Sequence, residues 1–60
     1  MGNLEQVKVE LKSKMNMDHV HLASANDGNH VLVGAKFQGN VKYTLFDDCG
    51  IVEEWEEKLN

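Results

Sequence analysis

The chain has 60 residues, of which 42% are hydrophobic, and it carries a formal net charge of −4 at pH 7. This length suits one domain, spanning residues 1–60, and the single cysteine, Cys49, excludes an internal disulfide. No apolar run approaches the roughly 20 residues of a membrane-spanning helix, and the first residues lack the apolar core of a signal peptide. We therefore expect a cytoplasmic protein that binds no membrane.

Residues 4–17 favour a helix. Their apolar residues recur at helical spacing, as Leu4, Val7, Leu11 and Met15. Lys12 and Lys14 fall where the last helical turn attracts cations. A strand is the alternative, since residues 7–11 also alternate between apolar and charged side chains.

Residues 19–46 predict three short strands joined by two tight turns. Apolar residues recur at every second position, in the sets Val20 and Leu22; Val31, Val33, Ala35 and Phe37; Val41, Tyr43 and Leu45. For the first hairpin we predict a two-residue type I′ loop of Asp27 and Gly28, which pairs Leu22 with Val33.

The second turn determines whether the three apolar sets share one face. A two-residue loop at residues 39–40 would send them to opposite faces. A three-residue loop over residues 38–40 pairs Phe37 with Val41 and unites the sets. We therefore predict the longer loop and one apolar face.

The C-terminal residues favour a second helix. Ile51, Val52, Trp55 and Leu59 lie on one helical face, and the adjacent Glu53 and Glu54 interrupt a strand alternation. A brief fourth strand over residues 50–54 is the alternative. The predicted fold is an α+β domain of order α-β-β-β-α, with a three-stranded antiparallel meander and both helices packed on one face.

Negative charge is concentrated at the C-terminus: residues 1–46 carry a net +1 and residues 47–60 a net −5. We name as the acidic ridge the residues Asp47, Asp48, Glu53, Glu54, Trp55, Glu56 and Glu57. Such a ridge suits a protein partner with a basic surface. The solvated side of an amphipathic helix would have the same composition.

The predicted registers also define an alternative site on the opposite sheet face, made of His19, His21, Leu32, Lys36, Lys42 and Phe46. An aromatic ring beside lysines suits stacked bases and phosphates, and it equally suits a protein interface. The two histidines are too few for a structural zinc site, which needs four ligands. We therefore expect no metal and no cofactor.

No nucleophile elbow, phosphate-binding glycine loop or Cys-x-x-Cys motif occurs in the chain. The sequence therefore predicts a small acidic, non-enzymatic protein-binding module, with inhibition or regulation of a nucleic-acid-handling enzyme as its specific role. A nucleic-acid-binding domain using the exposed sheet face is the alternative. A homodimer is a further expectation, because a chain this small without disulfides gains stability from association.

Overall fold

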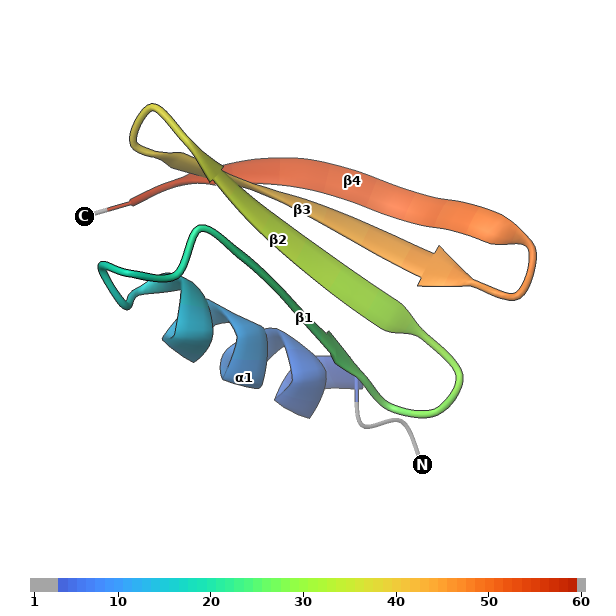
Figure 1. Cartoon of the computed structure of the whole chain (residues 1–60). Coiled ribbons are helices and arrows are strands. Elements are labelled where there is room, and N and C mark those ends of the chain that lie inside the picture. The colour runs from blue at the N-terminus through green and yellow to red at the C-terminus, as the bar shows by residue number, and fades with distance from the viewer. Residues whose placement is uncertain (1–3, 60) are drawn as a thin grey trace.

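The computed structural model of the protein describes residues 4–59 (Figure 1). The elements, in chain order, are α1 (Leu4–Met15), β1 (Leu22–Asn26), β2 (Val31–Phe37), β3 (Asn40–Asp47) and β4 (Gly50–Lys58). The strands form one antiparallel sheet of order β1-β2-β3-β4. The helix lies on one face of this sheet, over β1 and β2 (Figure 1). The α+β class is thus right, but the predicted order α-β-β-β-α is wrong, since the chain ends in a fourth strand.

The predicted first helix is confirmed. Val7, Leu11 and Met15 of its apolar stripe are buried, and Leu4 is half-buried at the edge of the core. Gly34 of β2 lies directly beneath the helix, where an added Cβ would stand 3.1 Å from the Met15 sulfur. The missing side chain therefore allows close approach of α1 to the sheet.

The core is a single layer between α1 and the sheet. Its buried residues are Val7, Leu11, Met15, Ala25, Leu32, Val41, Tyr43 and Leu45. Around them pack the half-buried Leu4, Val20, Ala23, Trp55 and Leu59. Within residues 4–59, no helix is long and apolar enough to cross a membrane.

The predicted three-residue loop of the second hairpin is wrong. Phe37 pairs with Asn40, so that only Gln38 and Gly39 form the loop. Their φ angles are 51° and 83°, and positive values at both positions are typical of a type I′ turn. The twist of this turn matches that of the flanking strands, which favours it over a longer loop.

The shorter loop shifts the β2–β3 register by one residue, and this shift inverts β2. Tyr43 pairs with Gly34 rather than with the predicted Ala35. A shift of one residue moves every side chain of a strand to the other face. Leu32 is accordingly buried, whereas Phe37 is 71% exposed. The predicted common apolar face is therefore wrong for β1 and β2, although it is right for β3.

The first hairpin also differs from the prediction. Asn26 pairs with Val31 and leaves a four-residue loop, Asp27–His30. The Asp27 carboxylate accepts hydrogen bonds from the backbone N–H groups of Asn29 and His30, at 2.9 and 2.7 Å. These bonds fold the loop around the aspartate side chain and stabilise it over the two-residue type I′ turn.

The predicted C-terminal helix is wrong, and the alternative strand extends further than expected, to Lys58. Trp55 pairs with Tyr43, and their rings stack with centroids 5.3 Å apart. The adjacent Glu53 and Glu54 are both exposed. An edge strand tolerates them, since its side chains reach water on both faces. A register shift between Leu45 and Phe46 marks a bulge in the pairing of β3 with β4.

Candidate functional site

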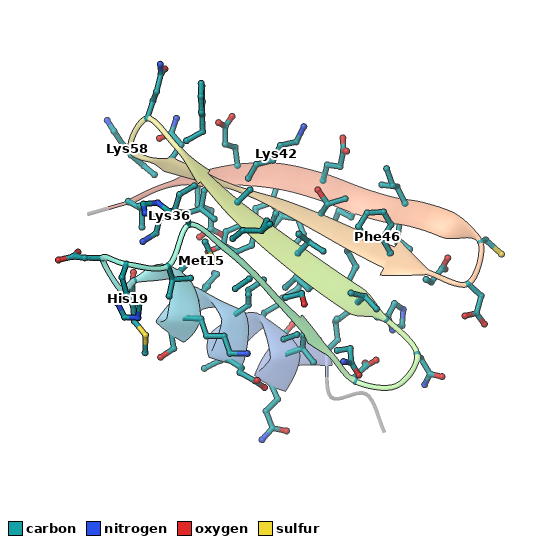
Figure 2. All side chains as sticks on the ribbon, viewed as in Figure 1. Met15, His19, Lys36, Lys42, Phe46 and Lys58 are labelled. Carbon is teal, nitrogen blue, oxygen red and sulfur yellow. The ribbon has the colours of Figure 1, made fainter. Side chains whose placement is uncertain are left out.

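The sheet face turned away from α1 is the candidate functional site, and we call it the outer face. Strand alternation and register place its residues: Leu22, Ser24 and Asn26; Val31, Val33, Ala35 and Phe37; Asn40, Lys42, Thr44 and Phe46; Ile51, Glu54, Glu56 and Lys58. Figure 2 shows Lys42 on the side of the sheet opposite to Met15 and the helix. Among residues 4–59, no element covers this face.

Much of the outer face is apolar. We call the following residues the apolar patch: Leu22, Val31, Val33, Ala35, Phe37, Phe46 and Ile51. Register makes them continuous, because Val31 pairs with Phe46 and Phe46 pairs with Ile51. Phe37 is 71% exposed and Leu22 69% exposed, and Val31 and Ile51 are exposed as well. Val33, Ala35 and Phe46 are half-buried between them. A continuous exposed patch of this kind marks an interaction surface more often than scattered apolar residues do.

The rest of the outer face carries balanced charge. Its ionisable residues, the charged corner, are Lys42, Glu54, Glu56 and Lys58. Lys42 and Glu56 are register partners on β3 and β4, and opposite charges in that relation stabilise a sheet. The charged corner is electrically neutral at pH 7, whereas the whole chain carries −4.

The acidic ridge is divided by the strand. Glu54 and Glu56 lie on the outer face, whereas Glu53, Trp55 and Glu57 lie on the helix side of β4. Asp47 ends β3, and Asp48 follows it in the turn. There the Asp47 carboxylate accepts a hydrogen bond from the Cys49 N–H at 2.7 Å. A helix would have put the acids on one solvated side, but the alternation of a strand sends them to both faces.

Two residues of the acidic ridge contact the rest of the fold. The Trp55 indole N–H donates to Glu57 at 3.0 Å, and Lys12 of α1 forms an ion pair with Glu57 at 3.3 Å. Lys8 of α1 lies 5.4 Å from the centre of the Trp55 ring, within reach of a cation–π contact. Burial, with a smaller contribution from Glu57, raises the pKa of Tyr43 beneath this cluster. Trp55 and Glu57 therefore connect β4 to α1 through side-chain contacts, whereas the helix packs on β1 and β2.

The alternative site of the sequence analysis is not assembled on one surface. Lys42 and Phe46 lie on the outer face, but Leu32 is completely buried. Lys36 lies on the helix side, where its ammonium group donates to the Met17 carbonyl. His19 and His21 are exposed in the connection between α1 and β1, not on a strand. Figure 2 shows His19 in this connection. The one-residue register shift separates Leu32 and Lys36 from the outer face.

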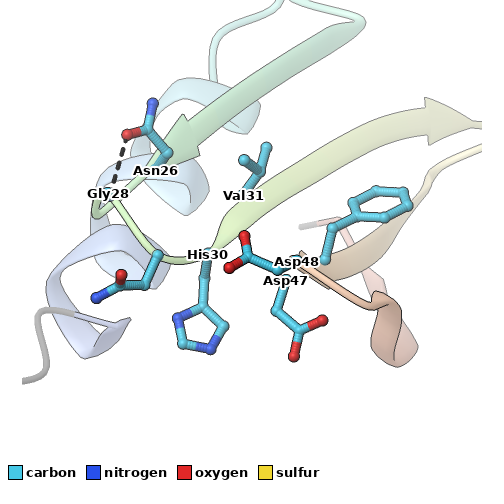
Figure 3. Close-up of a pocket in the computed structure, with 8 residues that line it drawn as sticks. Asn26, Gly28, His30, Val31, Asp47 and Asp48 are labelled. Carbon is cyan, nitrogen blue, oxygen red and sulfur yellow. Dashed lines mark hydrogen bonds between the residues drawn. The ribbon is translucent and has the colours of Figure 1, made fainter.

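A shallow pocket of about 160 Å³ lies between the β1–β2 and β3–β4 turns (Figure 3). Its lining includes His30, Asp47 and Asp48. Small-molecule sites usually enclose about 300 Å³ or more. Among residues 4–59, no group of three or more histidines, cysteines or acids is placed to hold a metal ion. The pocket is therefore a weaker candidate than the outer face.

Sequence reasoning identified Lys42, Phe46, Glu54 and Glu56 as candidate residues, and all four lie on the outer face. It missed most of the apolar patch, which it assigned to the core. The signal that could have identified the patch is the Gln38-Gly39 dipeptide, because a two-residue loop there exposes the odd-numbered residues of β2. No known protein family, curated protein or solved structure matches the chain.

Proposed function

We propose that this protein is a non-enzymatic protein-binding module and that the outer face is its binding surface. The observation that carries the proposal is the continuous apolar patch on a sheet face that no described element covers. Protein interfaces combine an apolar centre with a polar, charged rim. The apolar patch and the charged corner have this composition. An open sheet surface suits contact with another protein, because it does not enclose a small substrate as a catalytic pocket would.

A narrower part of the proposal concerns the acidic ridge. Asp47, Asp48 and Glu53 are exposed and lie off the outer face: Asp47 ends β3, Asp48 follows it in the turn, and Glu53 lies on the helix side of β4. They suit a second, basic protein surface, such as that of a nucleic-acid-handling enzyme in the cytoplasm. The specific role proposed for the module is the inhibition or regulation of such an enzyme.

Direct nucleic-acid binding has less support. Of the residues of that alternative site, only Lys42 and Phe46 lie on the outer face, and Glu54 and Glu56 lie beside them. A phosphate backbone would meet as many acids as lysines there, which opposes the counterion release that drives such binding.

Site-specific photocrosslinking in cells tests the proposal. A benzophenone side chain replaces Phe37 of the apolar patch in one variant and Val9 of α1 in a matched control, since these residues are 71% and 67% exposed. We expect a protein adduct from position 37 and none from position 9. Equal adducts from both positions, or none from position 37, would contradict the proposed function.

A further inference from the structure

We infer that the outer face binds a second copy of this chain, so that two sheets stack face to face with their helices on the outside. The inference rests on the proposed function and names the partner of the apolar patch. It is carried by the area of the face, by its symmetry and by its charge.

The area of the outer face is sufficient for a weak dimer. Four strands at a spacing of about 4.8 Å span roughly 19 Å, and the seven residues of β2 extend about 23 Å. The flat footprint is therefore about 440 Å² per copy, or roughly 900 Å² for two. This footprint lies below the roughly 1,200 Å² of standard specific interfaces, in the range of weak or transient contacts.

The apolar patch is arranged so that it can pair with itself. It runs the full length of β2, from Val31 to Phe37, with Leu22 on one side and Phe46 on the other. Consider a two-fold axis that lies in the plane of the contact and runs perpendicular to β2. It would place β2 on its copy, with Val31 of one copy near Phe37 of the other. Such an isologous contact needs only one surface, and aligned sheets pack in this way about 10 Å apart.

The charges of the outer face are compatible with a second copy and oppose a strongly anionic occupant. The charged corner contains two lysines and two glutamates, so the outer face has no net charge although the chain carries −4. Under the two-fold axis above, Glu56 of one copy lies opposite Glu54 of the other, and Lys42 lies beside each of these pairs and offsets their repulsion. A nucleic acid or a strongly acidic protein would meet Glu54 and Glu56. Asp47, at the end of β3, and Asp48, in the turn that follows, would stay accessible in the dimer.

Dimer formation would stabilise a chain whose own hydrophobic core is small. A chain of 60 residues buries only about 60% of its unfolded surface, and Cys49, the only cysteine, is exposed and free. Covering the second face of the sheet would add an apolar layer between the two copies. Small domains without disulfides commonly gain stability in this way.

Sedimentation equilibrium of the purified full chain, from 1 to 200 µM, tests the inference. We expect wild type to approach twice the chain mass. Phe37→Asp should weaken the dimer by about 100-fold, since a charge replaces an exposed aromatic side chain that the contact would bury. Val9→Asp, which adds the same charge on α1, should remain dimeric. Leu22→Asp, at another exposed position of the patch, provides a second disruptive variant, and circular dichroism confirms that each variant is folded.

The outcomes separate the inference from the proposed function. A wild-type monomer at 200 µM, or a dimer that survives both Phe37→Asp and Leu22→Asp, overturns the inference. If that monomer still gives an adduct to a different protein from position 37, the proposed function stands with another partner. If it gives no protein adduct, or only a nucleic-acid adduct, the proposed function fails as well.

Discussion

Gln38 occupies a backbone conformation that few side chains adopt. Its φ of 51° places it in the left-handed region at the first position of the β2–β3 turn. Residues with a Cβ pay a steric cost there, whereas asparagine is tolerated because its short side chain hydrogen-bonds locally. Asn-Gly is the preferred dipeptide of type I′ turns.

The substitution Gln38→Asn should therefore stabilise the protein by about 0.5 kcal/mol. For a domain of this size, that corresponds to a rise of roughly 2–4 °C in Tm. Thermal unfolding followed by circular dichroism measures it. Gly39→Ala is the converse test: an added Cβ meets nothing within 4 Å, but the φ of 83° strains any side chain, so Tm should fall. An unchanged or lower Tm for Gln38→Asn would contradict the turn assignment.

Asp27 makes the β1–β2 loop sensitive to acid. Hydrogen bonds from the backbone N–H groups of Asn29 and His30 lower the pKa of Asp27 below its ordinary 3.8, with a smaller contribution from the His30 side chain. A carboxyl whose pKa is lower in the folded state stabilises the fold above its unfolded pKa. That contribution is lost as the pH falls from about 4 through the lowered folded value.

We therefore expect Asp27→Asn to flatten the loss of stability between pH 5 and pH 2. Urea unfolding at several pH values measures this dependence. Asp18→Asn, which removes the same charge from the connection after α1, is the matched control and should leave the wild-type slope. Identical slopes for wild type and Asp27→Asn would show that the loop hydrogen bonds do not favour the carboxylate.

At the scale of elements, periodicity identified β1, β2 and β3 but could not orient β2. The segment Val31–Phe37 offers Val31, Val33 and Phe37 on one side and Leu32 with Gly34 on the other. Both sides are apolar enough to face a core. Only the length of the next turn distinguishes them, because the register decides the face. The sequence pattern therefore assigned the apolar half of the candidate site to the core, and most of the site was not predicted.

The local apolar pattern predicts the structure of the N-terminal segment correctly but not that of the C-terminal segment. The stripe of α1 is helical, and its capacity to bury Leu11 and Met15 makes the segment a helix in the fold. Residues 50–58 have a pattern that also fits a helix, but their structure depends on pairing with β3 and on the stack of Trp55 with Tyr43. That pairing depends on a neighbouring strand and not on the segment's own periodicity.

Trp55 is expected to anchor β4 to the sheet and to the helix. Trp55→Ala removes the stack on Tyr43, the contact with Lys8 and the hydrogen bond to Glu57. Because Trp55 is half-buried, we expect a loss of about 2–3 kcal/mol in the free energy of unfolding. Trp55→Phe keeps an aromatic ring on Tyr43 and should lose about 1 kcal/mol. Denaturant titration measures both, and equal losses would indicate that stacking contributes little.

At the scale of the whole molecule, the fold is a two-layer plate. Its principal extents are 31 × 18 × 15 Å, with α1 over β1 and β2 and the outer face on the other side. The sheet therefore has one face packed against the helix and one face exposed to solvent. In the proposed dimer the layers would follow the order helix, sheet, sheet, helix, and the centres of the two copies would lie about 20 Å apart.

Because both copies carry a net negative charge, added salt should strengthen this dimer. Two copies at −4 each, about 20 Å apart in water, repel by roughly 3 kcal/mol without screening. Raising the salt from 10 to 100 mM shortens the Debye length from about 30 to 10 Å and should remove about 1 kcal/mol of this repulsion. The dimer Kd should therefore fall about fivefold, as measured by sedimentation equilibrium at the two salt concentrations. An interface held mainly by pairs between lysines and glutamates would weaken instead, so a rise in Kd would show that the charged corner, not the apolar patch, dominates the contact.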